Sequence, residues 1–222
     1  MKTIVFIMSV AVMLTGFTFQ QKKLVIFFGD SITEAGVKPG GYINVFGEQL
    51  KQKGMDNGYE LQGAGIGGNK VYDLYLRLED DVMAKKPDVV VIWVGVNDVW
   101  HKSMYGTGTD PDKFEKFYTA IIKKLQGIHA QVVLCTPAAI GEKTDYTNSQ
   151  DGDLNQYAQI IRGIAQKNNC KLVDLRKILL DYNLANNNDN QPSGILTSDG
   201  VHLNEKGNAL VAEEMLKVLT SK

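Results

Sequence analysis

The sequence has few prolines, little charge imbalance and no persistent compositional bias. Five prolines among 222 residues, with 44% hydrophobic residues, exclude fibrous, low-complexity and intrinsically disordered proteins. The 24 Lys and Arg residues are balanced by 25 Asp and Glu residues, which gives a formal net charge of −1. No basic stripe alternates with aromatic residues, so we expect no nucleic-acid partner. This composition is typical of one ordinary globular domain.

One long apolar run lies at the N-terminus. Lys2 precedes the run Ile4–Leu14, and the small residues Gly16 and Thr18 follow it at the spacing of a cleavage site. This pattern is typical of a secretory signal peptide, and the run is shorter than the ~20 residues that span a membrane. We therefore expect residues 1–18 to be a signal peptide whose cleavage point stays open. The protein should be exported, periplasmic or secreted, without stable membrane insertion.

Export would place Cys135 and Cys170 in a compartment where disulfides form. Cys135 ends one apolar run, whereas Cys170 directly precedes the next. If these runs are neighbouring parallel strands, the sulfurs lie at opposite ends, several residues apart at ~3.3 Å per residue. A disulfide needs Cα atoms within ~7 Å of each other. We expect two free, buried thiols.

Short apolar runs alternate along the chain with segments of helical periodicity. The runs are Leu24–Phe28, Tyr59–Gln62, Val89–Val94, Gln131–Cys135 and Lys171–Leu175. Nearly continuous apolar runs are typical of parallel strands that are covered on both faces. Helical spacing marks residues 43–50, 71–82, 110–126, 154–164 and 211–219. The alternation predicts a single domain over residues 22–222, a three-layer, flavodoxin-like α/β/α sandwich on about five parallel strands.

Polar residues and glycines follow the predicted strands. In parallel sheets of this kind, ligands bind at the edge formed by the carboxyl ends of the strands. Ester hydrolysis needs a nucleophile, a base, a group that orients the base, and donors for the oxyanion. Ser31 follows the first strand, and Asp199 and His202 are close enough in sequence for one turn to present both. Gly68 offers an unobstructed N–H, and Asn97 offers a side-chain amide.

A different interpretation rests on Gly63, Gly65 and Gly68, which spell G-x-G-x-x-G. In dinucleotide-binding folds this motif follows the first strand, and an acidic residue ~20 positions on binds the ribose from the carboxyl end of the next strand. Here the motif follows the second apolar run, and Asp88 precedes the next strand at its amino end. The sequence therefore favours backbone amides that approach a substrate over a dinucleotide site.

The sequence resembles the SGNH, or GDSL-type, esterase and lipase family. The resemblance rests on four motifs that occur in the family's order, Gly29-Asp30-Ser31-Ile32-Thr33, Gly68, Gly95-Val96-Asn97-Asp98 and Asp199-Gly200-Val201-His202-Leu203. It implies that Ser31 is the nucleophile, His202 its base and Asp199 the acid that orients the base. It also implies that the Ser31 N–H, Gly68 and Asn97 form the oxyanion hole, and that no metal or other cofactor takes part. One departure is Gly63, where the family often has an asparagine.

Three predicted loops around this site are rich in polar and small residues: 100–110, 138–153 and 181–198. A long acyl chain would need an apolar pocket, so we expect a shallow cleft for short acyl groups, above all acetyl, on carbohydrates. Alternatives are a lysophospholipase or thioesterase, and a catalytically silent glycan-binding module of the same fold. We expect a monomer, and candidate substrate-binding residues are Asp30, Asp98, Trp100 and His101.

Overall fold

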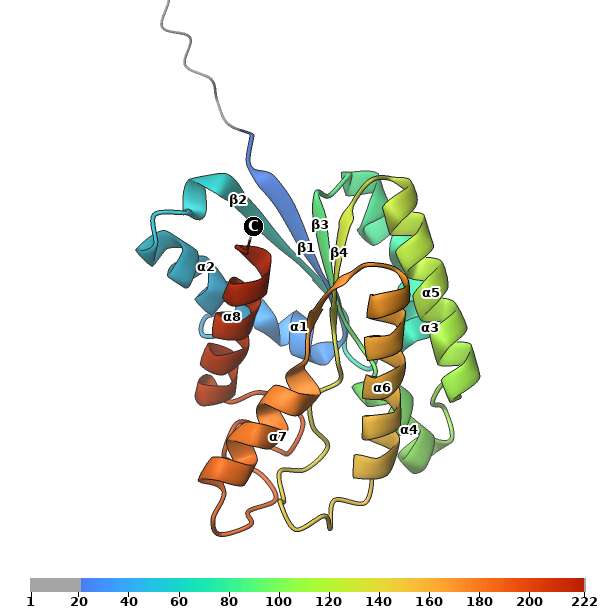
Figure 1. Cartoon of the computed structure of the whole chain (residues 1–222), viewed down its shortest axis with the longest axis vertical. Helices are drawn as coiled ribbons and strands as arrows, with labels where there is room; N and C mark the ends of the chain where they lie inside the picture. Colours follow the sequence, from blue (N-terminus) through green and yellow to red (C-terminus); the bar gives the residue numbers. More distant parts are fainter. Residues whose placement is uncertain (1–20, 222) are drawn as a thin grey trace, which may run out of the picture.

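The computed structural model describes residues 21–221, so the predicted signal peptide at 1–18 lies outside the described residues. Five strands in this range form one parallel sheet in the order β2-β1-β3-β4-β5 (Figure 1). The flavodoxin-like order confirms the predicted fold class. The strands are β1 (Lys23–Gly29), β2 (Tyr59–Gly65), β3 (Val89–Trp93), β4 (Gln131–Cys135) and β5 (Lys171–Val173).

Helices cover both faces of this sheet (Figure 1). They are α1 (Ser31–Gly36), α2 (Tyr42–Gln52), α3 (Val71–Asp81), α4 (Val96–Tyr105), α5 (Pro111–Gly127), α6 (Asp151–Lys167), α7 (Leu175–Asn186) and α8 (Glu205–Leu219), with short 3₁₀ turns η1 (Asp56–Gly58) and η2 (Met83–Lys85). Helices α2, α7 and α8 pack on one face, and α3, α5 and α6 pack on the other. Within residues 21–221 no helix combines the length and apolar character needed to cross a membrane.

Two hydrophobic cores form because successive side chains of a strand point to opposite faces of the sheet. Val25 and Phe27 of β1 join the core beneath α2, α7 and α8, whereas Ile26 and Phe28 join the core beneath α3, α5 and α6. All four side chains are fully buried. The continuous apolar run of β1 is therefore the consequence of burial on both faces.

Three helices were not predicted. Helix α1 begins at Ser31, directly after β1, and α4 and α7 occupy part of the predicted loops 100–110 and 181–198. In α4 the buried residues include Asn97 and Asp98, and in α7 they include Asn183. Because these inward-facing positions are polar, the hydrophobic periodicity of both helices is weak in the sequence.

The fifth strand and one cysteine also differ from the prediction. Strand β5 ends at Val173, because the next residue, Asp174, begins α7 by accepting a hydrogen bond from the Lys177 N–H. Both thiols are free, as predicted, and Cys135 is buried, but Cys170 is only partly buried. The prediction of two buried thiols was wrong for Cys170, which lies just before β5 where the end of the strand leaves it partly exposed.

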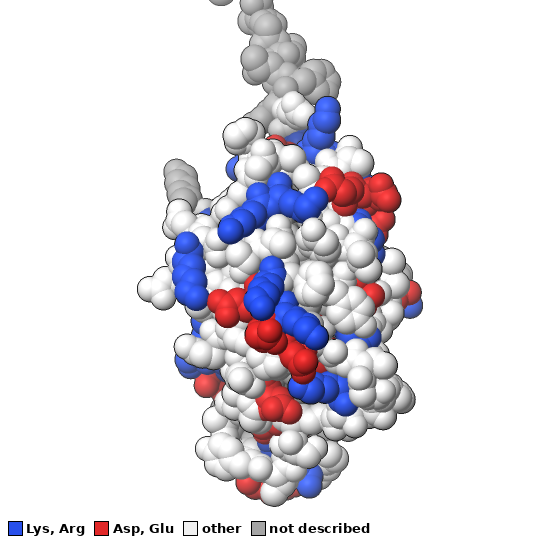
Figure 2. All heavy atoms as spheres, turned by 90° about the vertical axis from the view of Figure 1, so that its right-hand side faces the viewer, with Lys and Arg blue, Asp and Glu red and all other residues white. Residues whose placement is uncertain are grey.

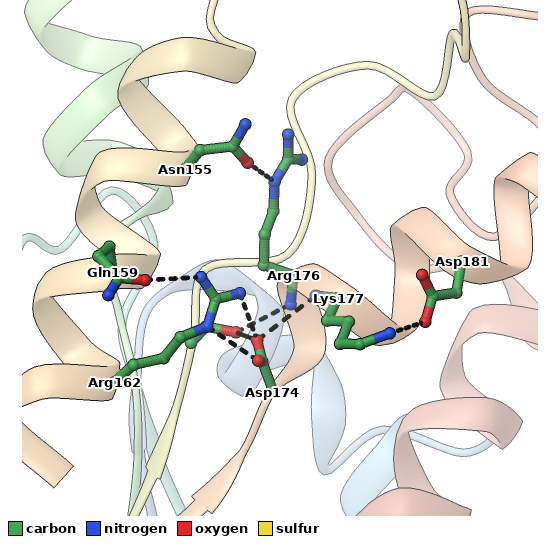
Figure 3. A network of polar contacts seen from close by, with 8 residues as sticks. Asn155, Gln159, Arg162, Asp174, Arg176, Lys177 and Asp181 are labelled. Carbon is green, nitrogen blue, oxygen red and sulfur yellow. Dashed lines mark hydrogen bonds and ion pairs between the residues drawn. The ribbon is translucent and has the colours of Figure 1, made fainter. Parts of the chain in front are cut away.

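A buried arginine lies where α7 meets α6 (Figure 3). The Arg176 guanidinium donates hydrogen bonds to Asn155 Oδ1 (2.7 Å), Asp151 Oδ1 (2.7 Å) and the Ala138 carbonyl (3.1 Å). Only 5% of Arg176 is exposed. These bonds tie α7 to α6 and to the segment that follows β4.

Replacing this arginine should destabilise the fold substantially. Arg176→Met leaves the Asp151 carboxylate and the Ala138 carbonyl without their partner, so we expect the free energy of unfolding to fall by about 2–4 kcal/mol. Lys177→Met is the matched control, because it removes an exposed ion pair with Asp181 on the same helix (Figure 3) and should cost less than about 1 kcal/mol. Urea unfolding measures both, and equal losses would contradict the role of Arg176.

Candidate active site

The register of the sheet brings three chain segments to one edge. Gly29, at the end of β1, pairs with Gly65 at the end of β2 and with Trp93 at the end of β3. Neighbouring strands lie ~4.8 Å apart, so the segments that follow these three strands leave the sheet side by side and at the same level. They carry Ser31, Gly68 and Asn97.

Local sequence explains how Ser31 reaches this edge. Asp30 is the N-cap of α1, and its Oδ1 accepts a hydrogen bond from the Ile32 N–H at 3.0 Å. Gly29 is required because a Cβ atom there would collide with the Trp93 carbonyl and with Thr33. The Ser31 N–H lies in the first turn of α1, where N–H groups have no partner within the helix.

Ser31, His202 and Asp199 form a hydrogen-bonded row. Ser31 Oγ lies 2.9 Å from His202 Nε2, and His202 Nδ1 lies 2.7 Å from Asp199 Oδ2. A proton on Nδ1 satisfies the carboxylate and leaves Nε2 free to accept from the serine hydroxyl. The structure thus places the predicted nucleophile, base and orienting acid in the geometry of a catalytic triad.

Asp199 is held in its ionised form. Partial burial alone would raise its pKa, but the His202 ring and the N–H groups of His202 and Val201 donate hydrogen bonds to it, and the net effect lowers the pKa. An ionised carboxylate can stabilise the imidazolium that forms when histidine takes a proton.

A buried carboxylate supports the loop that carries Asp199 and His202. The two Glu142 oxygens accept hydrogen bonds from the N–H groups of Ile195, Leu196 and Thr197 at 2.7–2.9 Å, and Glu142 is 1% exposed. The Gly141 N–H also donates to the Gly200 carbonyl at 2.8 Å. The sequence did not identify Glu142, because an acid in a polar stretch carries no signal that distant N–H groups will surround it.

The predicted oxyanion donors lie beside the serine segment. Gly68 has a φ of +75°, a conformation that favours glycine, and it follows β2 in the loop that leads to α3. Asn97 lies in the first turn of α4 and is 4% exposed. Its Nδ2 donates to the Asn69 carbonyl at 3.1 Å, and an amide NH₂ group has a second hydrogen for another acceptor.

Two of the candidate substrate-binding residues do not reach the surface. Asp30 and Asp98 are 3% and 0% exposed. Asp98 accepts hydrogen bonds from the Val71 N–H at 3.2 and 3.3 Å, so both carboxyls are occupied at the starts of helices. Their contact with substrate stays a prediction, while the structure places both carboxyls where they support the starts of α1 and α3. Burial raises the pKa of Asp30 to about 6 and that of Asp98 to about 7.

The other two candidates flank the site. The His101 ring lies 5.9 Å from the Trp100 ring and 5.3 Å from the Tyr105 ring, between centroids. His101 Cε1 would lie 3.6 Å from a Cβ atom built on Gly68, so the imidazole stands next to the predicted oxyanion hole. Burial and the nearby charge of Lys70 lower the pKa of His101, which favours a neutral, apolar ring face.

The dinucleotide interpretation finds no support at this edge. Asp88 Oδ2 accepts a hydrogen bond from the Leu24 N–H at 2.7 Å, near the start of β1 and therefore at the opposite end of the sheet from Gly68. In the part of the chain that the structure describes, no three His, Cys, Asp or Glu side chains are grouped so that they could hold a metal ion.

A family model and two sequence relatives match this chain. The model of the GDSL-like lipase/acylhydrolase family matches residues 27–210. An acetylxylan esterase from Geobacillus stearothermophilus is 30% identical over 165 residues, which are 67% of this chain and 74% of that protein. The uncharacterized lipoprotein YqeF from Bacillus subtilis is 25% identical over 214 residues, covering 85% of this chain and 86% of the lipoprotein.

Solved structures of acetylxylan esterases also match this chain. The crystal structure of the acetyl xylan esterase AlAXEase is 65% identical and superposes with a TM-score of 0.86, covering 87% of this chain and 98% of that one. A catalytic mutant of an acetylxylan esterase from Geobacillus stearothermophilus is 25% identical, with a TM-score of 0.79 and coverage of 91% and 97%.

The buried Asp98 predicts a pH-dependent stability. Its folded-state pKa of about 7 exceeds the ~3.9 of an unfolded chain, so folding favours the protonated carboxyl and its contribution to stability falls as pH rises from about 4 to 7. Asp98→Asn keeps an oxygen acceptor for Val71 but never ionises. Relative to the parent, the variant should gain at least about 1 kcal/mol in free energy of unfolding between pH 5 and pH 8.

Urea unfolding at the two pH values measures this gain. Asp80→Asn, at an exposed position on α3, is the matched control and should change much less with pH. The assignment fails if the Asp98 and Asp80 variants respond to pH alike.

Proposed function

Because this chain belongs to the GDSL-like lipase/acylhydrolase family and is a carboxylic ester hydrolase, we propose that it removes short acyl groups, above all acetyl, from carbohydrates through an acyl-enzyme on Ser31. The observation that carries the proposal is the hydrogen-bonded row from Ser31 through His202 to Asp199. Each residue of the row occupies the position that its role requires.

Catalysis begins when His202 Nε2 takes the Ser31 proton as Oγ attacks the ester carbonyl. The new bond joins Oγ to the carbonyl carbon, and the carbonyl electron pair moves to oxygen. His202 then returns the proton to the departing alcohol oxygen, which leaves Ser31 acylated. A water molecule repeats the sequence on the acyl-enzyme, releasing the carboxylic acid and restoring the serine.

The oxyanion is stabilised by donors that are fixed before substrate arrives. The N–H groups of Ser31 and Gly68 and the free amide hydrogen of Asn97 supply three donors at the carboxyl edge of β1, β2 and β3. Because these donors belong to helix starts and a short loop, little reorganisation is needed as charge develops.

The substrate follows from the surroundings of the row. The Asp199 and His202 side chains are 50% and 36% exposed, so the site opens directly to solvent and leaves little buried surface for a long acyl chain. The Trp100, His101 and Tyr105 rings lie along one side, where a sugar ring can stack. The acetylxylan esterases among the relatives act on acetylated carbohydrate, which supports the same substrate class here.

Export is also part of the proposal. The N-terminal pattern of Lys2, the apolar run and the small residues is that of a signal peptide, and one relative is a lipoprotein. A polysaccharide ester outside the cytoplasm would suit an exported enzyme. We propose that the mature chain acts as a monomer, since all the catalytic groups come from one chain.

The nucleophile is tested by Ser31→Ala. Removing Oγ should lower kcat/KM for 4-nitrophenyl acetate by at least about 10³-fold while circular dichroism and the melting temperature stay close to the parent. Ser103→Ala, at an exposed position on α4, is the control and should leave activity unchanged. A fluorophosphonate probe should label the parent and not the Ser31 variant; a parent that stays unlabelled and inactive would instead favour the silent glycan-binding module.

The acyl preference is tested with 4-nitrophenyl esters from acetate to decanoate and with acetylated xylooligosaccharides. We expect kcat/KM to be highest for acetate and to fall as the chain lengthens, because the open site offers little apolar surface to bury added methylenes. Acetate release from the oligosaccharide should be detectable by NMR. A preference for chains longer than about eight carbons would point to the lysophospholipase or thioesterase alternative.

A further inference from the structure

Arg77 of α3 connects two strand ends with the loop that follows Gly68. Its Nη2 donates hydrogen bonds to the Gly29 carbonyl (2.8 Å) and to the Ala64 carbonyl (2.9 Å). Its Nε donates to Asn69 Oδ1 at 2.7 Å. Gly29 lies two residues before Ser31, and Asn69 directly follows Gly68, so one guanidinium contacts both segments that carry main-chain oxyanion donors.

Arg77 is connected to the third oxyanion donor, the Asn97 amide, through Asn69. The Arg77 guanidinium holds the Asn69 side chain, and the Asn69 main-chain carbonyl accepts the hydrogen bond from Asn97 Nδ2 at 3.1 Å. This bond uses one of the two amide hydrogens of Asn97 and sets the direction of the other. The orientation of the free hydrogen therefore depends on the position of the Asn69 peptide.

Arg77 itself is held rigidly. Its Nη1 donates to Asp81 Oδ2 at 2.6 Å, one turn further along α3, and the guanidinium lies 4.5 Å from the centre of the Phe28 ring. Only 14% of its side chain is exposed. Four hydrogen bonds and the stacked ring leave the guanidinium almost no freedom to move.

We infer that Arg77 is a positioning residue for ester hydrolysis, which sets the oxyanion donors of Ser31, Gly68 and Asn97 relative to one another. The inference rests on the proposed function, because it concerns the same oxyanion hole. Arg77 acts through carbonyls and through Asn69 and does not touch the substrate. The planar guanidinium suits this role, since its N–H groups point in several fixed directions, whereas a lysine ammonium lacks this geometry.

Loss of Arg77 should affect kcat more than KM. An oxyanion exists only after attack, so a displaced donor weakens the transition state and leaves ground-state binding of the ester nearly unchanged. Arg77→Met should lower kcat for 4-nitrophenyl acetate by about 10–100-fold, with KM within about threefold of the parent. Asn69→Ala, which removes only the Nε acceptor, should change kcat in the same direction by a smaller factor.

A double-mutant cycle separates positioning from general damage. In an Asn97→Ala background the amide that Arg77 orients is already gone, so Arg77→Met should cost only a few-fold more in kcat. Arg162→Met is the matched control: its guanidinium pairs with Asp174 through two 2.9 Å hydrogen bonds between α6 and the start of α7, and its loss should leave kcat unchanged.

The outcomes are distinct. An unchanged kcat in both the Arg77 and Asn69 variants would overturn the inference. The same loss from Arg77→Met in the parent and in the Asn97→Ala background would overturn the part of it that concerns Asn97. If Arg77→Met does not fold, the cycle between Asn69→Ala and Asn97→Ala decides it by the same criterion. Ser31→Ala is measured in the same assay; activity that survives this change counts against the proposed function rather than against the role of Arg77.

Discussion

The site depends on the hydrogen-bonded register of β1 with β2 and β3. Because Gly29 pairs with Gly65 and with Trp93, three strands end at one level and their following segments meet. A slip of one residue would move a segment by ~3.3 Å, more than the length of a hydrogen bond. Close packing at the strand ends allows only glycine at two positions of this register. A Cβ atom on Gly29 would collide with the Trp93 carbonyl, and a Cβ atom on Gly65 would collide with the start of α1.

Rigidity at this edge is achieved with buried charge-bearing groups, which oppose stability. Asp30 and Asp98 each accept a hydrogen bond from the first turn of a helix, α1 and α3 respectively. Both helices begin beside the site, so these carboxyls fix the direction in which Ser31 and the Gly68 loop leave the sheet. Their raised pKa values show that burial outweighs the hydrogen bonds they receive. The fold thus accepts a local loss of stability where geometry must be constant.

The half of the site that carries Asp199 and His202 is not positioned by the sheet register. Asp199 and His202 lie on a loop before α8, and no strand holds this loop at the level of the serine. Glu142 holds the loop in place by accepting hydrogen bonds from three of its N–H groups. The buried Glu142 carboxylate, in the segment after β4, therefore helps to position the His202 imidazole beside Ser31. The other side of the loop is open, so His202 and Asp199 are accessible to solvent.

The residues of the candidate site could be identified from the sequence because their types and order are local properties. Ser31, Gly68, Asn97 and the Asp199 to His202 segment each follow or precede a recognisable element. The distances and orientations that bring these residues together, and the residues that support them, could not be identified from residue type and order. Asp98 could be named from the sequence only as a candidate substrate-binding residue, because its contact with the Val71 N–H depends on how α3 approaches α4.

The sequence by itself determined the five strands and five of the helices, because burial on both faces of a sheet or on one face of a helix imposes a period that is visible in consecutive residues. Tertiary structure alone decided that α1, α4 and α7 are helical, that Asp30 and Asp98 are buried, and that Glu142 and Arg77 support the site. The physical reason is that a polar side chain can be buried only where partners satisfy it. For Glu142 those partners lie more than 50 residues away along the chain, so no local pattern records them.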